Sequence, residues 1–382
     1  MGARAARHGT TGAAAAVRYN RAPMVTDLTR RRLADLEAVV HAPGKSGARW
    51  LILTHDNPDP DSLASAALLA RLLRRAFGQR VTIGYGGIIG RAENREMVKI
   101  LHLRLSRLRH LNLKHYRRFA LVDAQPATGN HQLPDELVPD LVFDHHPVRR
   151  ATQAVPFADV RTDYGATATI LGEYLEAAGL RPSRAQATAL IYAIRTETQD
   201  FLREAAGPDR ALYDELLPRA DKRALAKIQS APLPVSYFRT LHEALEGLET
   251  VGTLVVSHMG AVEQPDIVPE IADLLLRMEG KTWALATGLF EGRVYLSIRT
   301  SNPRGEAGAR MRRLLGQRGK GGGHGTTAGG WIAIPPESRD DPRPLQRRLA
   351  ARLARALRKD PRRLAPIPLQ APAESGDRPR AR

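Results

Sequence analysis

The chain has 382 residues, a length that favours two domains over one, and its 43% of hydrophobic residues is enough to fill cores of ordinary size. It has no cysteine, which excludes disulfides, thiolate metal sites and cysteine nucleophiles, and no apolar run of about 18 residues that would predict a membrane span. The net charge of +18 favours polyanionic partners, although the arginine-rich residues 343–382 contribute to it. We therefore expect a cytoplasmic protein without a membrane partner.

The first half of the chain alternates helical patterns with short apolar runs. Helices are predicted over residues 29–42, 61–77, 167–178 and 183–195, and strands over residues 50–54, 81–85, 119–122 and 141–143. This alternation is typical of a parallel α/β sheet with both faces covered. Polar residues that follow different strands should then meet outside the carboxyl ends of the sheet, where ligands bind in such folds.

The second half predicts a smaller α/β domain at residues 241–340. Its strands are expected at residues 252–258, 282–290 and 294–300, and its helices at residues 268–278 and 305–315. Proline-punctuated residues 206–240 are interpreted as a helical connector between this domain and a catalytic domain at residues 27–205. Residues 1–26 are expected to be a disordered leader, with Met24 as an alternative start, and residues 341–382 a basic helix and a disordered tail.

The first predicted strand is followed by a turn rich in metal-binding side chains, His-Asp-Asn-Pro-Asp-Pro-Asp at residues 55–61. It holds one imidazole, from His55, and two carboxylates at alternate positions, Asp59 and Asp61. Oxygen and imidazole ligands suit Mn²⁺, Mg²⁺ or Fe²⁺. The alternative is a solvated acidic loop in which Asp61 and Ser62 only cap the helix that follows.

Two further strands end in residues of the same kinds. Asp123 comes directly after an apolar strand and can bridge two metals, or can cap a turn. The next strand ends in Asp144-His145-His146, where one imidazole can bind metal and the other can face a substrate. Asp144 can fix the tautomer of an imidazole by accepting a hydrogen bond.

These motifs resemble motifs one to three of the DHH phosphoesterase superfamily, and the resemblance runs from about residue 50 to residue 201. That superfamily includes the RecJ exonuclease, the nanoRNase/pAp phosphatases, the cyclic dinucleotide phosphodiesterases and the family II pyrophosphatases. Gly321-Gly322-Gly323-His324, followed by Ala328-Gly329-Gly330, resembles the signature of the DHH-associated domain. Pyrophosphatases carry a different C-terminal domain, so this signature counts against them.

The resemblance implies two divalent metal ions, with Mn²⁺ expected and Mg²⁺ or Fe²⁺ as alternatives. His55 and Asp59 would hold one ion, and Asp61 and His145 would hold the other. Asp123 would bridge the two. Metal-assisted attack of water on phosphorus needs no protein nucleophile, which agrees with the lack of cysteine.

The resemblance also implies roles for His146, Asp144 and a fourth motif. His146 would contact the scissile phosphate or protonate the leaving oxygen, with Asp144 beside it as a catalytic residue. The fourth motif departs from the family pattern, because the usual aspartate is replaced by Glu197 in Thr-Glu-Thr-Gln-Asp-Phe, residues 196–201. We expect Glu197 to bind metal; Asp200 is the alternative, and on a helix it would share a face with Glu197.

The C-terminal domain is expected to bind the substrate. The glycine-rich residues 319–330 offer backbone N–H groups with no Cβ in the way of an anion, the alternative being a flexible loop. The resemblance places substrate-binding residues at Ser297, Arg299, Gly322, Gly323 and His324.

The sequence therefore predicts a hydrolase that cuts phosphate esters in short RNA or DNA oligonucleotides or in small nucleotides. A RecJ-like exonuclease is the first alternative, favoured by the basic charge but disfavoured because aromatic residues make up only 5% of the chain. A non-catalytic nucleotide-sensing module is the second, supported by Glu197 alone. The sequence leaves open which substrate is cut and whether the chain forms a homodimer.

Overall fold

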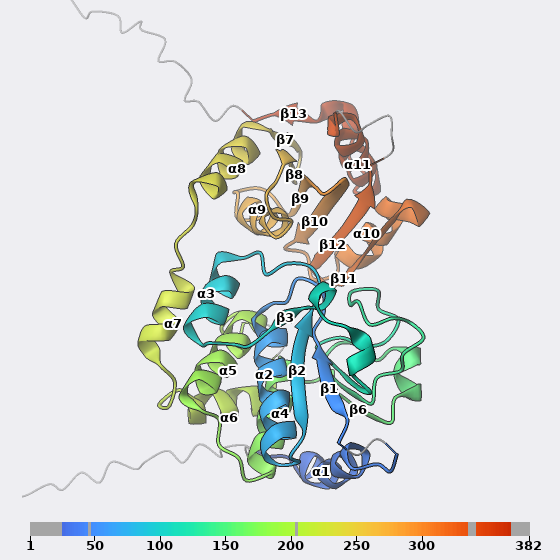
Figure 1. Cartoon of the computed structure of the whole chain (residues 1–382). Coiled ribbons are helices and arrows are strands. Elements are labelled where there is room, and N and C mark those ends of the chain that lie inside the picture. The colour runs from blue at the N-terminus through green and yellow to red at the C-terminus, as the bar shows by residue number, and fades with distance from the viewer. Residues whose placement is uncertain (1–24, 45–46, 203–204, 335–340, 368–382) are drawn as a thin grey trace, which may run out of the picture. The chain divides into compact units, whose positions relative to one another are not determined.

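The computed structural model describes residues 25–44, 47–202, 205–334 and 341–367 and divides the chain into two compact units (Figure 1). The first unit comprises residues 1–86 and 101–225, and the second comprises residues 87–100 and 226–382. The division at residue 225 falls inside the expected connector. Residues 87–100 lie in the middle of the first unit's sequence but pack with the second unit.

The first unit is built on a six-stranded sheet in the order β3-β2-β1-β4-β5-β6, in which every neighbouring pair is parallel. This confirms the predicted parallel α/β fold. The strands are β1 (Arg49–Leu53), β2 (Arg80–Tyr85), β3 (Ser106–Arg107), β4 (Arg118–Val122), β5 (Leu141–Asp144) and β6 (Phe157–Val160). The sequence predicted four of them and missed the short β3 and β6.

The helices of the first unit lie close to their predicted positions. They are α1 (Asp27–Val40), α2 (Pro60–Arg75), α4 (Thr167–Ala177), α5 (Arg184–Glu197), α6 (Gly207–Leu216) and the first part of α7 (Lys222–Gln229). Helix α2 packs against both α4 and α5. It begins at Asp59, whose side chain accepts a hydrogen bond from the backbone N–H of Ser62, and Pro60 occupies its first turn.

The second unit contains a seven-stranded sheet in the order β11-β12-β10-β9-β8-β7-β13. Its strands are β7 (Leu248–Val251), β8 (Leu254–Ala261), β9 (Trp283–Phe290), β10 (Arg293–Thr300), β11 (Gly319–His324), β12 (Thr327–Ala333) and β13 (Ala365–Pro366). Only β8 and β9 pair in parallel. The α/β class of this domain is confirmed.

Each face of the second sheet supports its own hydrophobic core. Along β10, Val294, Leu296 and Ile298 join the core under α10 (Ala307–Leu315) and α11 (Arg343–Ala356). Tyr295, between them, packs on the opposite core with α8 (Val235–Glu246) and α9 (Ile267–Leu275). Alternation of this kind follows from the two-residue period of a strand.

The glycine-rich segment forms two paired strands, β11 and β12, which the sequence did not predict, and it is not the flexible loop that was the alternative. Glycine is needed there because α10 lies against the hairpin. A Cβ at Gly321 would come within 2.6 Å of Leu315 Cδ1, and one at Gly308 in α10 would collide with the backbone oxygen of Gly323. Gly322, in contrast, has open space where its Cβ would be.

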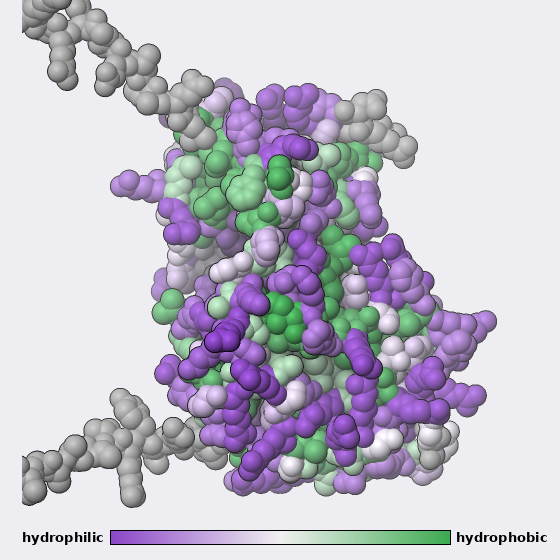
Figure 2. Space-filling model, turned by 60° about the vertical axis from the view of Figure 1, so that its left-hand side comes forward, coloured by the Kyte–Doolittle hydropathy of each residue, from purple (hydrophilic) through white to green (hydrophobic). Residues whose placement is uncertain are grey.

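Hydrophilic residues cover much of the face shown in Figure 2. Within the described parts of the chain, no helix is long and apolar enough to cross a membrane.

Candidate metal centre

The predicted metal ligands converge because their strands are neighbours in the first sheet. The chain passes from β1 to β2 on one side and later returns to the other side of β1 with β4 and β5. Ligand sites in open α/β sheets form at this kind of reversal, outside the carboxyl ends of the strands. His55 follows β1, Asp123 follows β4 and His145 follows β5, so strands about 4.8 Å apart bring the three side chains together.

The converging side chains form two groups that share Asp123. In one group His55 Nε2 lies 3.5 Å from Asp59 Oδ1 and 3.5 Å from Asp123 Oδ2. In the other, His145 Nε2 and His146 Nδ1 each lie 3.6 Å from Asp123 Oδ1. The side chains of each group have potential ligand atoms within 4.8 Å of one another, although His146 Nδ1 also contacts Asp144 at 2.9 Å. This is the arrangement expected for a carboxylate that bridges two ions.

In His55 and His145, contacts to Nδ1 leave Nε2 as the ring nitrogen that can face a metal. His55 Nδ1 lies 2.9 Å from the Asp56 carbonyl, and His145 Nδ1 lies 3.2 Å from the Tyr164 carbonyl. Because a carbonyl can only accept, each Nδ1 carries a proton, so Nε2 is the nitrogen that could offer a lone pair to a cation once it is deprotonated. His145 Nε2 is buried and has no hydrogen-bond partner among the described residues. A buried atom in that state fits a metal ligand.

Asp123 is held in place from both its backbone and its side chain. Its φ of 56° lies in the left-handed region, which aspartate and asparagine tolerate better than most residues. Its backbone N–H donates to the Phe143 carbonyl at 2.9 Å, and the Thr167 hydroxyl donates to its Oδ1 at 3.1 Å. The carboxylate is 3% exposed, so it faces the two groups and little else.

Asp61 caps a helix in addition to its predicted role as a metal ligand. It is fully buried, and its two oxygens accept the backbone N–H groups of Thr167 and Ala168, both at 2.8 Å. Asp61 therefore caps the N-terminus of α4, while its Oδ2 stays 4.0 Å from His145 Nε2. Each carboxylate oxygen has a further lone pair, so the cap and a metal contact are compatible.

The structure brings Glu197 to this centre and places Asp200 outside it. Glu197 Oε1 lies 4.0 Å from His145 Nε2, whereas Asp200 pairs with Arg195 Nε at 2.6 Å and its side chain is 63% exposed. Helix α5 ends at Glu197, and Gln199, Asp200 and Phe201 all have positive φ. The chain turns away after Glu197, so the helical spacing that would put Asp200 on the same face does not apply.

Crowded carboxylates shift one another's pKa. Burial, and after it the charges of Asp59 and Asp123, raise the pKa of Glu197 to about 8. Burial and the charges of Asp123, Glu197 and Asp59 raise the pKa of Asp61 well above its usual value. Without cations the centre therefore holds protons in their place.

His55 and Asp59, in contrast to these crowded carboxylates, stabilise each other's charged form as an ion pair. Burial lowers the pKa of His55, but Asp59 and Asp123 outweigh it and the net pKa lies well above the usual value. Burial acts to raise the pKa of Asp59, but the charge and hydrogen bond of His55 and the N–H of Ser62 bring it below the usual value.

The Asp144-His145-His146 segment is organised by a residue that sequence reasoning missed, Gln125. Asp144 Oδ1 accepts from the backbone N–H of His145 at 2.8 Å and from His146 Nδ1 at 2.9 Å. Gln125 Nε2 donates to Asp144 Oδ2 at 2.6 Å, and Gln125 Oε1 accepts from the Thr152 hydroxyl at 2.8 Å. The position of Gln125 two residues after Asp123, at the end of a buried strand, was the available signal.

His146 is the most exposed imidazole of the centre, with 41% of its side chain accessible. Burial lowers its pKa, but the hydrogen bond to Asp144 and the charges of Asp123 and Asp144 raise the pKa to about 9. Thr167, the second residue that the sequence did not reveal, also contacts Asp123.

Two of the predicted substrate-binding residues contact one another in the second unit. Ser297 is buried and accepts a hydrogen bond from Arg299 Nη1 at 2.7 Å, while Arg299 Nε pairs with Asp273 at 2.5 Å. Gly322 and Gly323 lie in β11. The backbone of His324 ends β11, and its side chain lies outside what the structure describes.

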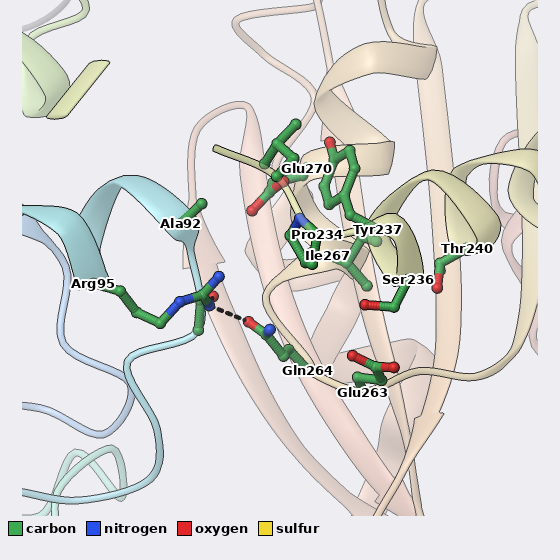
Figure 3. Close-up of a pocket in the computed structure, with 12 residues that line it drawn as sticks. Ala92, Arg95, Pro234, Ser236, Tyr237, Thr240, Glu263, Gln264, Ile267 and Glu270 are labelled. Carbon is green, nitrogen blue, oxygen red and sulfur yellow. Dashed lines mark hydrogen bonds between the residues drawn. The ribbon is translucent and has the colours of Figure 1, made fainter. Parts of the chain in front are cut away.

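The second unit also has a small pocket beside α3 (Ala92–Ile100), with a volume of about 30 Å³ (Figure 3). Arg95 reaches across it to Gln264 at 2.8 Å, as the dashed line in Figure 3 shows. Arg91 pairs nearby with Glu270 at 3.7 Å. These contacts explain why residues 87–100 pack with the second unit, and the space holds little more than one or two waters.

Comparison with known proteins identifies both domains. Residues 49–194 match the DHH family, N-terminal domain, and residues 252–341 match the DHHA1 domain. An uncharacterised protein of Methanocaldococcus jannaschii is 34% identical over 289 residues, which cover 75% of this chain and 58% of that protein. The chain thus spans little more than half the length of this relative.

Among solved structures, an exopolyphosphatase-related protein from Bacteroides fragilis has the same fold, with a TM-score of 0.63 at 13% identity over 86% of this chain and 96% of the other. The DHH match covers His55, Asp123 and His145 and ends just before Glu197, the position that departs from the family pattern. With both domains present in this order, the chain belongs to the DHH family, whose members are typically metal-dependent phosphoesterases.

Proposed function

We propose that the chain hydrolyses phosphate esters of short oligonucleotides or small nucleotides with the help of two divalent metal ions. The observation that carries this proposal is the pair of ligand groups that share Asp123. The buried Nε2 of His145, which has no hydrogen-bond partner in the described part of the chain, supports it, because buried polar atoms are normally satisfied.

The donor set indicates which residues would hold each ion. His55, Asp59 and Asp123 would hold one, and Asp61, His145 and Asp123 would hold the other, with Glu197 beside them. Carboxylate and imidazole donors favour Mn²⁺, with Mg²⁺ or Fe²⁺ as alternatives. When bound, two such cations would activate water and offset charge on the phosphate oxygens.

His146 is proposed to act on the leaving oxygen. Asp144 holds its Nδ1–H, and Gln125 in turn holds Asp144, so the imidazole has one orientation. With a pKa of about 9 the ring carries a proton at neutral pH. It can therefore contact the phosphate as a cation and supply a proton where negative charge develops.

The second unit is proposed to bind the rest of the substrate. Arg299 is ready to accept an anion because its guanidinium is already oriented by Ser297 and Asp273. A phosphate would compete with Asp273 for the Nε–H while Nη1 keeps its contact with Ser297. Gly322 is the glycine of β11 with open space beside it, which suits close approach of a ligand. Gly323 and His324 complete the proposed set.

A substrate panel tests this function. The full chain with Mn²⁺ would be incubated with pAp, linear and cyclic dinucleotides, a trinucleotide, polyphosphate and a long single strand, and the products resolved. We expect turnover of one or more of the small nucleotide substrates, abolished by a chelator. Preference for the long strand would favour a RecJ-like exonuclease, for which the net charge of +18 is the supporting observation. If no substrate is turned over in the presence of Mn²⁺, Mg²⁺ or Fe²⁺, even though substrates bind, the proposal would be contradicted.

A further inference from the structure

The first unit has a cavity of about 300 Å³ at the ends of α2 and α5 that lie away from the metal centre. Helix α2 carries Asp61 in its first turn and reaches the cavity with its last turns. Helix α5 reaches the cavity with its first turn and carries Glu197 at its end. Ten residues of helix separate Asp61 from Arg71, a distance of about 15 Å.

Four arginines line this cavity. Arg71, Arg74 and Arg75 come from α2, and Arg104 comes from the segment before β3. Among the described residues that line the cavity none is acidic, and in the same parts of the chain none of the four arginines forms an ion pair with a carboxylate. Basic residues in the last turn of a helix complement its dipole, but the dipole of α2 does not explain Arg104.

Backbone carbonyls hold two of the four arginines, Arg71 and Arg74, in position. Arg71 Nη2 donates to the Arg181 carbonyl at 2.8 Å, and Arg74 Nη2 donates to the Val81 carbonyl at 2.7 Å. Arg71 Nε is buried and has no acceptor among the described residues. Burial, and after it the positive charge of Arg104, lower the pKa of Arg74. Among the described residues, the fold therefore holds like charges near one another without a paired carboxylate to offset their repulsion.

The remaining walls define the ligand further. Ser183 caps the N-terminus of α5, where the positive end of the helix dipole faces the cavity lining at Ala185. Ala67, Ala70 and Ile83 supply an apolar wall. A ligand that fits would carry a phosphate for the arginines and a compact apolar part for that wall, within a volume typical of small-molecule sites.

We propose that this cavity, bounded by Arg71, Arg74, Arg75 and Arg104, binds a small phosphate monoester of about the size of a nucleoside monophosphate. The site is separate from the metal centre, and the proposal does not depend on the reaction proposed above. Because the walls come from α2 and α5, the bound ligand would contact the far ends of two helices that carry candidate metal ligands.

The test is calorimetric titration of the full chain with inorganic phosphate and, separately, with adenosine 5′-monophosphate. It would be done on the Mn²⁺-loaded protein and again after chelation, which removes anion binding that depends on metal. We expect anion binding at the cavity to remain after chelation, and its sensitivity to R74E/R104E distinguishes it from anion binding at Arg299. In R74E/R104E the dissociation constant at the cavity should rise by about 100-fold or more, since each charge-assisted contact contributes about tenfold. Tighter binding of the nucleotide than of phosphate would identify the organic phosphate as the ligand.

The matched control is R109E/R117E, which makes the same charge change on exposed arginines of the same unit outside the cavity. Its binding should stay within about twofold of wild type. Circular dichroism would check folding, and R74Q/R104Q would replace the charge-reversal variant if that one unfolds. Equal weakening in the cavity and control variants, or no metal-independent binding of either ligand to wild type, would overturn the proposal.

Discussion

Replacing Asp123 by asparagine removes one negative charge from the point that the two proposed metal sites share. Its oxygens lie 3.5–3.6 Å from His55, His145 and His146, and among the described residues it is the carboxylate common to both ligand groups. We expect loss of both metal equivalents at Mn²⁺ concentrations that saturate wild type. The value of kcat/KM should fall by at least about 1,000-fold, which corresponds to about 4 kcal/mol of transition-state stabilisation.

The fold should survive this change. Asparagine can still accept the Thr167 hydroxyl, a contact that contributes about 0.5–1.5 kcal/mol, and it tolerates the left-handed backbone at this position. Loss of the charge also relieves the repulsion that helps to raise the pKa of Asp61 and Glu197. The free energy of unfolding of the metal-free protein should therefore change by no more than about 1 kcal/mol. Asp123→Ala should abolish hydrolysis as well, but should unfold more easily.

Three measurements would be made on Asp123→Asn: hydrolysis, bound Mn²⁺ and urea unfolding in the presence of a chelator. Asp200→Asn is the matched control, because it makes the same carboxylate-to-amide change at an exposed ion pair outside the centre. An Asp123→Asn protein that keeps two Mn²⁺ and full turnover would refute the shared-ligand reasoning. A large loss of stability without metal would indicate that Asp123 is mainly structural.

Three further predictions concern Glu197 and Asp200, His324, and the pH dependence of metal binding. Glu197→Ala should lose metal at one site and nearly all activity, whereas Glu197→Asp should keep much of both. Asp200→Asn should change activity by less than about tenfold, because Asp200 lies in an exposed ion pair. Titration of activity with Mn²⁺ measures these effects, and an inactive Asp200→Asn together with an active Glu197→Ala would reverse the assignment. His324→Ala should weaken substrate binding or turnover with metal content unchanged, and loss of a metal equivalent would contradict its proposed role. Because the pKa of Glu197 is about 8 and that of Asp61 is raised, cations must displace protons, so apparent Mn²⁺ affinity should increase with pH up to about 8. Calorimetry in buffers of different ionisation enthalpy would show the proton release, and affinity independent of pH between about 6 and 8 would contradict it.

Much of the fold followed from apolar runs and helical periodicity. Four of the six parallel strands and the predicted helices of this unit lie within a few residues of their predicted positions. Strand β3 is two residues long, too short to give a pattern, and in β6 the polar Asp159 interrupts the apolar run. Strands β11 and β12 were missed because glycine disfavours strands, and the reason for the glycines, the contact with α10, is tertiary.

The candidate site also contains residues that the sequence predicted and residues that it did not. His55, Asp123 and His145 each sit at the end of a recognisable strand, so sequence order was enough to predict that they meet. Gln125 and Thr167 gave no such signal, because their roles depend on hydrogen bonds across the fold to Asp144 and Asp123.

We propose that two metal ions that share Asp123 drive hydrolysis of a small phosphate ester. The most direct measurement is Mn²⁺-dependent turnover of the short nucleotide panel by the wild-type chain, with bound metal counted in the same preparation. We expect two Mn²⁺ per chain and turnover that rises as the second site fills. Full turnover with a single Mn²⁺ bound, or undiminished turnover in the presence of a chelator, would contradict it.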